Sequence, residues 1–293
     1  MKKIKVNNNL IEFDRIVAYG CSHTEAVETE DHNIIGISSS ACDDLKRKTK
    51  MGDFYHEFIF NNVTPLELKE INRQNSYIKH LSDIFEVEHV NHAIGGSSLD
   101  YSSYLLSKHL YETDSKDDHC IRKNDLIIVG VTCPNRLFYF SDYDAGDCTH
   151  STHLQMSNPS MWERNTGKYF YENCIDTIAN DKTLAWKYFQ QVNYLHMLSK
   201  ENNNRIILVP MIHTVQQWMS LKYSELYKLF NNRISEMSCL LSESFEPFVH
   251  HLFQDTNSRK RATKNEICGY GHVRTEEHIK FAKRLYKELT KGI

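Results

Sequence analysis

Two short, almost continuous apolar runs constrain the fold of this chain more than any other feature. They are Asp125–Val131 (DLIIVGV) and Arg205–Met211 (RIILVPM), and both are rich in β-branched residues. Runs of this length are too short for most helices, and the lack of polar alternation is typical of strands buried on both faces of a parallel sheet. The sequence therefore predicts a parallel sheet with helices on both sides.

Further strands and helices are predicted along the whole chain. Shorter apolar runs predict strands at Arg15–Gly20, Val87–Ala93 and Pro247–Phe253. Helical patterns cover Asn75–Phe85, Ser98–Glu112, Thr183–Lys200, Val215–Ser242 and Thr275–Leu289. This alternation predicts an α/β fold, a three-layer α/β/α sandwich around a central parallel sheet, formed by residues 1–293 as one domain.

Two long stretches fit neither a strand nor a helix layer. Thr24–Arg73 follows the first predicted strand, and Pro134–Lys182 follows the third. Ligands bind at the carboxyl ends of the strands in open α/β sheets, and long loops in compact domains are usually functional. We therefore expect insertions at about 24–73 and 134–182 that form the walls of a substrate site.

Charge and cysteine content exclude several functional classes. A net charge of −3 predicts no general attraction to nucleic acid or to a membrane surface. The longest apolar stretch is too short to span a bilayer, and the N-terminus lacks the apolar core of a signal peptide. The eight cysteines are dispersed without a CxxC pair, which is typical of a reducing compartment. We expect a cytoplasmic protein. The abundance of Asn, Lys, Ile and Tyr suggests the AT-rich genome of a phage or a bacterium. A phage protein would be located in the virion or in the cytoplasm of the infected host.

A Gly-x-Ser-x-Thr segment, Gly20-Cys21-Ser22-His23-Thr24, follows the first predicted strand. A turn from a strand into a helix exposes a hydroxyl group and leaves a backbone N–H beside it to bind an oxyanion. The alternative interpretation is a serine that only caps the next helix.

Three more segments follow in order. Asn91-His92-Ala93-Ile94-Gly95-Gly96 comes after the second predicted strand, Thr132-Cys133-Pro134-Asn135 after the third, and Gly271-His272 before the final helix. A glycine allows the backbone to approach a reacting carbon closely. The alternative for the second segment, a phosphate-binding loop, lacks the spacing of a dinucleotide site.

These four segments together resemble the SGNH, or GDSL-like, hydrolase family from Arg15 to Leu289. The resemblance implies that Ser22 is the nucleophile and His272 the general base. It also implies an oxyanion hole formed by the N–H groups of Ser22 and Gly96, with Gly95 as the alternative to Gly96. Thr132 or Asn135 would be the third donor, or the third donor is missing. It implies no metal or organic cofactor.

The chain departs from the family pattern at several positions. Cys21 and Cys133 occupy positions of family Asp residues, Thr132 that of an Asn, and Val273 that of a Pro. Gly269 stands where the resemblance implies the acid that orients the histidine. We therefore expect a backbone carbonyl or a water molecule to orient His272, with the acids Asp255 and Glu266 as alternatives. His278 is expected to be a structural residue of the last helix.

The function implied by this resemblance is that of a serine esterase. We expect it to hydrolyse a carboxylic ester of a small molecule or carbohydrate, with an O-acetyl group on a carbohydrate as the favoured substrate. The alternatives are a binding or virion-associated protein that keeps the SGNH fold without turnover, and an acyltransferase of the same fold.

Other clusters of polar and aromatic residues carry no assigned chemistry. Six Asp, Cys and His residues lie within twelve positions of the second insertion, namely Asp142, Asp144, Asp147, Cys148, His150 and His153. Their spacing matches no closed zinc site, so we expect a solvated loop. We also expect the basic run Arg259–Lys264 to be a solvated loop. The alternative is that its charge attracts an anionic or polysaccharide substrate. The aromatic run Leu137–Tyr143 is expected to pack the insertion, or else to stack on a sugar.

Overall fold

The structure is a computed structural model of the chain. It describes residues 1–6, 9–95, 97–111, 120–132, 136–140, 151–155, 181–211, 232–234, 236, 237, 239, 241 and 272–293. For residues 136–140, 151–155, 181 and 182 only the backbone is described.

Four parallel strands form the central sheet, in the spatial order β4-β3-β5-β8. They are β3 (Arg15–Tyr19), β4 (Glu88–Asn91), β5 (Asp125–Val131) and β8 (Ile206–Pro210). The register places Ala18 of β3 beside Asn91 of β4 and Ile128 of β5. The chain therefore leaves β3 toward one side for β4 and returns to the other side for β5. In open α/β sheets, ligands bind at the carboxyl ends of the strands where the chain changes direction in this way.

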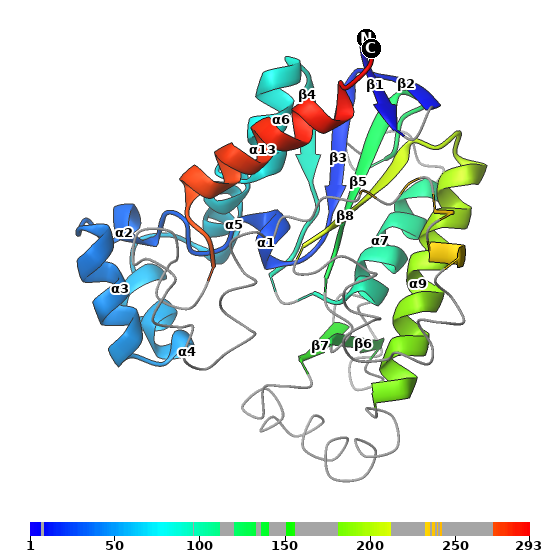
Figure 1. Ribbon diagram of the computed structural model, residues 1–293. Helices are drawn as coiled ribbons and strands as arrows, with labels where there is room; N and C mark the ends of the chain where they lie inside the picture. Colours follow the sequence, from blue (N-terminus) through cyan, green and yellow to red (C-terminus); the bar gives the residue numbers. More distant parts are fainter. Residues whose placement is uncertain are drawn as a thin grey trace.

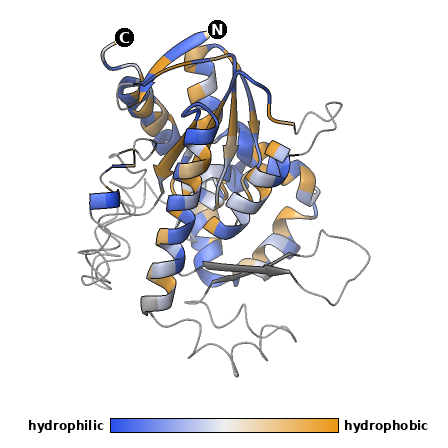
Figure 2. Ribbon diagram, turned by 90° about the vertical axis from the view of Figure 1, so that its right-hand side faces the viewer, coloured by the Kyte–Doolittle hydropathy of each residue, from blue (hydrophilic) through white to orange (hydrophobic). Residues whose placement is uncertain are grey.

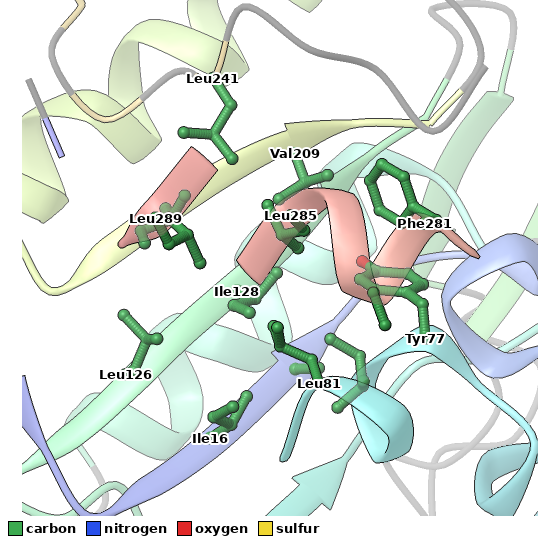
Figure 3. Packing of buried hydrophobic residues seen from close by; sticks show 14 of the residues in the cluster. Ile16, Tyr77, Leu81, Leu126, Ile128, Val209, Leu241, Phe281, Leu285 and Leu289 are labelled. Atoms are coloured by element: carbon green, nitrogen blue, oxygen red, sulfur yellow. The ribbon is translucent and has the colours of Figure 1, made fainter. Parts of the chain in front are cut away.

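Helices cover both faces of this sheet, which confirms the predicted α/β/α layers (Figure 1). One face carries α6 (Tyr77–Phe85) and α13 (Thr275–Leu289), and the other carries α7 (Leu99–Tyr111) and α9 (Asp181–Glu201). Side chains of β5 alternate between the two cores. Leu126 and Ile128 pack with α6 and α13 (Figure 3), whereas Ile127 and Val129 pack with α7 and α9.

Four of the five predicted strands and four of the five predicted helices agree closely with the structure. The fifth strand, Pro247–Phe253, lies outside the described residues, as does most of Val215–Ser242. The strands of the sheet are mainly hydrophobic, and the helices carry both apolar and polar residues (Figure 2). None of the described helices is long and apolar enough to cross a bilayer.

An antiparallel hairpin at the N-terminus was not predicted. It consists of β1 (Lys2–Val6) and β2 (Asn9–Phe13). Ile4, Val6, Ile11 and Phe13 are buried in the core beneath α13. The alternation of these residues with polar ones is a period-two pattern, which was the available signal for two strands with one buried face.

The first insertion is helical, whereas the sequence analysis assigned it no secondary structure. It contains α1 (Ser22–Glu25), α2 (Asp31–Ile34), α3 (Ser39–Lys48), α4 (Met51–Phe54), the π-helical turn η1 (Tyr55–Ile59) and α5 (Pro65–Gln74). Side-chain caps begin two of these helices: Ser38 accepts a hydrogen bond from Ala41 N–H, and Thr64 forms a capping box with Glu67. Four buried side chains form a small separate core, namely Cys42, Phe54, Ile59 and Leu68.

The second insertion contains a pair of antiparallel strands. These are β6 (Arg136–Phe140) and β7 (Ser151–Gln155), with Arg136 opposite Gln155. The remainder of this insertion lies outside the described residues.

Close packing at the carboxyl ends of β3 and β5 depends on two glycines. A Cβ atom on Gly20 would lie 3.3 Å from the Cα of Gly130, and a Cβ on either glycine would come closer than 3.0 Å to Thr24 Oγ1. The Thr24 side chain is fully buried and also contacts Met211, with 3.5 Å between Oγ1 and Sδ. The space left by two missing side chains therefore holds Thr24, and with it the turn that carries Ser22.

We expect Gly130→Ala to lower the free energy of unfolding by about 1–3 kcal/mol, the cost of overpacking a filled core. Thr24→Ala removes the Oγ1 atom that the methyl group added at Gly130 would meet. The free energy of unfolding of the double variant should therefore fall by less than the sum of the two single decreases. Denaturant unfolding measures both terms. Gly52→Ala is the matched control, since a Cβ there meets nothing within 4 Å. Additive losses would contradict this account of Thr24.

Candidate active site

The strand β3 leads into the short helix α1 (Figure 1), and Ser22 is the first residue of α1. The preceding Cys21 is extended, with φ −98° and ψ −164°, and its side chain is buried in the α6–α13 core. The first N–H groups of a helix have no acceptor within that helix, so the Ser22 N–H is a suitable donor for an oxyanion. The side chain of Cys21 lies in this core, so a weakly polar residue fits the position at which the family that the sequence resembles has an Asp.

The loop after β4 is joined to the Ser22 turn by buried hydrogen bonds. Asn91 Nδ2 donates to the carbonyl of Thr24 at 2.9 Å, and Ser97 Oγ donates to the carbonyl of Gly20 at 2.7 Å. Bonds to buried backbone carbonyls are costly to break because an unsatisfied polar group is left behind. The two segments that resemble family motifs are therefore held together as one unit.

Gly95 lies close to Ser22, and its N–H is occupied by a carboxylate. A Cβ atom on Gly95 would lie 4.0 Å from the Cβ of Ser22, and the Gly95 N–H donates to Glu25 Oε2. Burial raises the pKa of Glu25 above its usual range, against the opposing effects of Arg73 and of the Gly95 N–H. Gly96, which the sequence favours as the oxyanion donor, lies outside the described residues.

Thr132 follows β5 at the same edge of the sheet. Its side chain is buried, and Oγ1 has no hydrogen-bond partner within the part of the chain that the structure describes. A buried hydroxyl without a partner is unusual and calls for an explanation. Asn135 and Cys133 lie outside the described residues, so the choice between Thr132 and Asn135 stays open.

A carboxylate contacts His272, where we expected a neutral partner. Glu28 Oε2 lies 2.7 Å from Nδ1 of the imidazole and also accepts a bond from the His272 N–H at 3.3 Å. A carboxylate at Nδ1 fixes the orientation of the ring, holds the proton on that nitrogen and leaves Nε2 free to act as a base. The structure therefore places Glu28, and not the expected backbone carbonyl or water molecule, at Nδ1 of His272. The alternative acids Asp255 and Glu266, together with Gly269, lie outside the described residues.

The backbone and surroundings of Glu28 support this contact. Glu28 has a left-handed conformation, with φ +73°, which is uncommon for a residue other than glycine. Burial raises its pKa, but the charge and hydrogen bonds of His272 together with Lys46 outweigh this effect, so its pKa falls below the usual value. An uncommon backbone conformation that aims a buried carboxylate at an imidazole is typical of a functional site.

His272 lies beside the turn that carries Ser22. Its ring centroid is 5.3 Å from that of His23, the residue after Ser22. Ser22 Oγ and the imidazole make no hydrogen bond with each other among the described residues. Such bonds are often long before a substrate is bound, so this geometry is compatible with a serine–histidine pair.

His278 is a core residue. It is 1% exposed, its ring is stacked on that of Tyr77, and its Nδ1 accepts the Tyr77 N–H at 3.2 Å. Burial, reinforced by the charges of His80 and His272, lowers its pKa to about 3. A neutral, buried imidazole that caps α6 is a structural residue, as its place on the helix predicted.

No set of three or more His, Cys, Asp and Glu side chains in the described residues is arranged to hold a metal ion. Of the cluster from Asp142 to His153, the structure describes only the backbone of His153 in β7. The aromatic run Leu137–Tyr143 is described only as the backbone of residues 137–140, and the basic run Arg259–Lys264 lies outside the described residues.

Sequence reasoning missed Glu25 and Glu28 as residues of the site. The only signal was a group of acids just after Ser22, at Glu25, Glu28, Glu30 and Asp31. No spacing rule connects such a group to a histidine that is 244 residues further along the chain.

No protein-family model matches this sequence, and no curated protein matches it either. Similar solved structures include a lipolytic protein of the G-D-S-L family from Desulfitobacterium hafniense, with 12% identity and a TM-score of 0.42, covering 94% of this chain and 99% of that one. A carbohydrate esterase whose active site is described as having divergent catalytic and non-catalytic binding functions has 14% identity and a TM-score of 0.45, with coverages of 95% and 69%. A GDSL-like lipase from Parabacteroides merdae has 9% identity and a TM-score of 0.37, with coverages of 97% and 98%.

The opposite pKa shifts of Glu25 and Glu28 predict opposite effects of pH on stability. A lowered carboxyl pKa stabilises the fold above the ordinary value of about 4.3, and this contribution is lost as the pH falls through the folded pKa. A raised pKa contributes stability at low pH that is lost as the pH rises through the folded pKa. The stability that Glu28→Gln loses relative to the unchanged protein should therefore be greatest near pH 7. The stability of Glu25→Gln relative to the unchanged protein should instead rise from pH 4 to pH 7.

Thermal or denaturant unfolding of both variants at about pH 4, 5.5 and 7 measures this difference. Each variant is the control for the other, since both exchange a buried carboxylate in the same turn for an amide of equal size. Parallel pH profiles would show that the two carboxyl groups have the same environment.

Proposed function

We propose that this protein is a serine hydrolase that cleaves a carboxylic ester, with Ser22 as nucleophile and the His272–Glu28 pair as base. One observation carries the proposal. The His272 imidazole, oriented by a buried carboxylate at 2.7 Å, lies beside the turn that presents Ser22 at the carboxyl end of β3. A nucleophile, a base and a group that orients the base are the three parts that activated serine chemistry needs.

In the first half of the reaction, His272 Nε2 takes the proton of the Ser22 hydroxyl as Oγ attacks the acyl carbon. The carbonyl π electrons move to oxygen and form a tetrahedral oxyanion, which collapses as the bond to the alcohol breaks. His272 returns the proton to the departing alcohol. Water then attacks the acyl-serine in the same way and releases the acid.

Glu28 stabilises the imidazolium that exists only between these proton transfers. An ionised partner at Nδ1 is most favourable at the moment when the ring carries its positive charge, so it lowers the barrier more than it strengthens substrate binding. The low pKa of Glu28 supports this role, because the carboxyl group is then ionised at neutral pH.

The oxyanion is assigned to backbone and hydroxyl donors around the end of β3. The Ser22 N–H and the Gly96 N–H are the proposed backbone donors, as in the family that the sequence resembles. The Thr132 hydroxyl, buried and without a described partner, is the proposed third donor in preference to Asn135. The Gly95 N–H is less suited because Glu25 already occupies it.

A carbohydrate is the proposed alcohol part of the ester, with acetate as the acyl group. A hollow of about 450 Å³ is lined by Ser38, Ser39, Ser40, Asp43, Asp44, Arg47 and Arg274. Its guanidinium groups are paired internally, Arg274 with Asp43 and Arg47 with Asp44. Hydroxyl groups and paired charges suit a neutral polyhydroxyl ligand better than an acyl chain, and Arg274 is two residues from His272.

The proposal predicts that Ser22 is activated. A fluorophosphonate probe should label it, and Ser22→Ala should abolish labelling and p-nitrophenyl acetate hydrolysis. The thermal midpoint should change little, because the Ser22 hydroxyl makes no hydrogen bond to any residue that the structure describes. Mass spectrometry of the labelled peptide identifies the site. Ser107→Ala on α7 is the control and should keep both signals.

Three outcomes separate the candidate functions. Labelling at another residue, or turnover retained by Ser22→Ala, would move the chemistry away from Ser22. A well-folded protein that neither reacts with the probe nor hydrolyses esters would favour a glycan-binding or virion-associated protein. Ester consumption that increases with added alcohol and yields a new ester would identify an acyltransferase.

The assignment of the third donor predicts a specific kinetic loss. Thr132→Val removes the hydroxyl at nearly unchanged shape, and kcat should fall on the order of 10²-fold while KM changes little, as for other single oxyanion donors. The stability of the folded protein should not decrease, since no described group bonds to this hydroxyl. Thr132→Ser, which keeps the donor, should stay near the unchanged protein. This role would be contradicted if kcat and KM fell by similar factors in Thr132→Val and in Thr132→Ser.

A further inference from the structure

Lys46 is a fully enclosed lysine behind the His272–Glu28 pair. Its side chain is 1% exposed and extends from α3 toward two buried carboxylates. The Nζ atom lies 2.8 Å from Asp31 Oδ2 and 3.5 Å from Glu28 Oε1. It also lies 5.4 Å from the centre of the Phe54 ring, within reach of a cation–π interaction.

The burial of this lysine requires ionised partners. An isolated ammonium group in the protein interior would be neutralised, because desolvation is too costly without opposite charge nearby. Asp31 is itself held by the hydroxyl of Tyr55 at 2.9 Å. Burial raises the pKa of Asp31, and Lys46 opposes this rise.

These contacts form one continuous chain from the first insertion to the imidazole. Tyr55 donates to Asp31, Asp31 pairs with Lys46, Lys46 pairs with one oxygen of Glu28, and the other oxygen of Glu28 contacts His272 Nδ1. All members except His272 belong to residues 24–73. A helical segment outside the α/β/α layers thus reaches the centre of the site.

We propose that Lys46 is a positioning residue of the site, which acts through Glu28 and sets how much negative charge lies behind the His272 imidazole. The inference rests on the proposed function, in which His272 gains and loses a proton. Two carboxylates and one ammonium leave a single negative charge behind the ring. Protonation of His272 during the reaction neutralises that charge, so the cluster favours the imidazolium without burying an excess of anions.

Other ionisable groups face His272 and act on it in parallel. Besides Glu28 these are His23, whose ring is 5.3 Å away, Glu25, and His278, which interacts with the charge of His272 only when it is itself protonated, at low pH. The test must therefore change the Lys46 cluster alone and leave these groups in place.

Two variants separate the charge of Lys46 from its packing. Asp31→Asn removes one negative charge and leaves a neutral Glu28–Lys46 pair. The double variant Asp31→Asn/Lys46→Met removes a charge of each sign and restores the single negative charge behind His272. It also avoids two buried carboxylates without a cation, which could prevent folding of the single variant Lys46→Met.

We expect the pH midpoint of His272 protonation to fall by about one unit in Asp31→Asn and to return by a similar amount in the double variant. NMR of labelled histidine side chains measures this midpoint, with His272→Gln to assign the signal. Lys48→Met is the matched control, because it removes a cation from the same helix at an exposed position and should leave the midpoint unchanged.

Identical midpoints in Asp31→Asn and in the double variant would overturn the proposal and leave Lys46 as a structural ion pair. The NMR measurement does not depend on catalysis, so it decides the role of Lys46 even if no ester is hydrolysed. If the protein is an esterase, the acidic limb of the pH profile of kcat/KM should move in the same direction as the NMR midpoint, which a purely structural lysine would not cause.

Discussion

The site depends on how closely the backbone can pack where β3 and β5 end. Gly20 and Gly130 leave a gap that the Thr24 side chain fills, with Met211 beside it. Because Thr24 is two residues after Ser22, its burial fixes the turn that presents the serine, and the bond from Asn91 to the Thr24 carbonyl fixes the loop after β4 to the same turn. The Gly-x-Ser-x-Thr segment of this chain is therefore a packing requirement at the strand ends.

The acid partner of a histidine can come from any element that reaches Nδ1. Here it comes from Glu28 in the turn after α1, and Gly269 stands at the position that the family resemblance assigned to it. The requirement is a buried, ionised oxygen at hydrogen-bond distance, which Glu28 meets at 2.7 Å with Lys46 on its other side. The absence of an acid at Gly269 therefore does not leave His272 without an acid partner, because the helical first insertion provides Glu28.

The layers of the fold could be predicted because burial on two faces leaves a clear signal in runs such as Asp125–Val131. The positions of Ser22, Thr132 and His272 near strand ends and a helix start followed from the same reasoning. The helices of the first insertion were missed, since their short lengths and small separate core leave no strong periodicity. Glu28 could not be predicted either, because its contact with His272 joins two ends of the chain and depends on a left-handed turn.

Glu25 and Glu28 show why the environment of a residue decides its chemistry. Both are buried carboxylates in one turn, three residues apart, yet the pKa of Glu25 is raised and that of Glu28 is lowered. Glu28 has His272 and Lys46 as close partners, whereas the closest partner of Glu25 is the amide of Gly95. Burial favours the neutral form of both acids, and only at Glu28 do the hydrogen bonds and charge interactions with His272 and Lys46 outweigh it. The turn thus places a readily ionised carboxyl group at His272 and one that is harder to ionise at Gly95, close to Ser22.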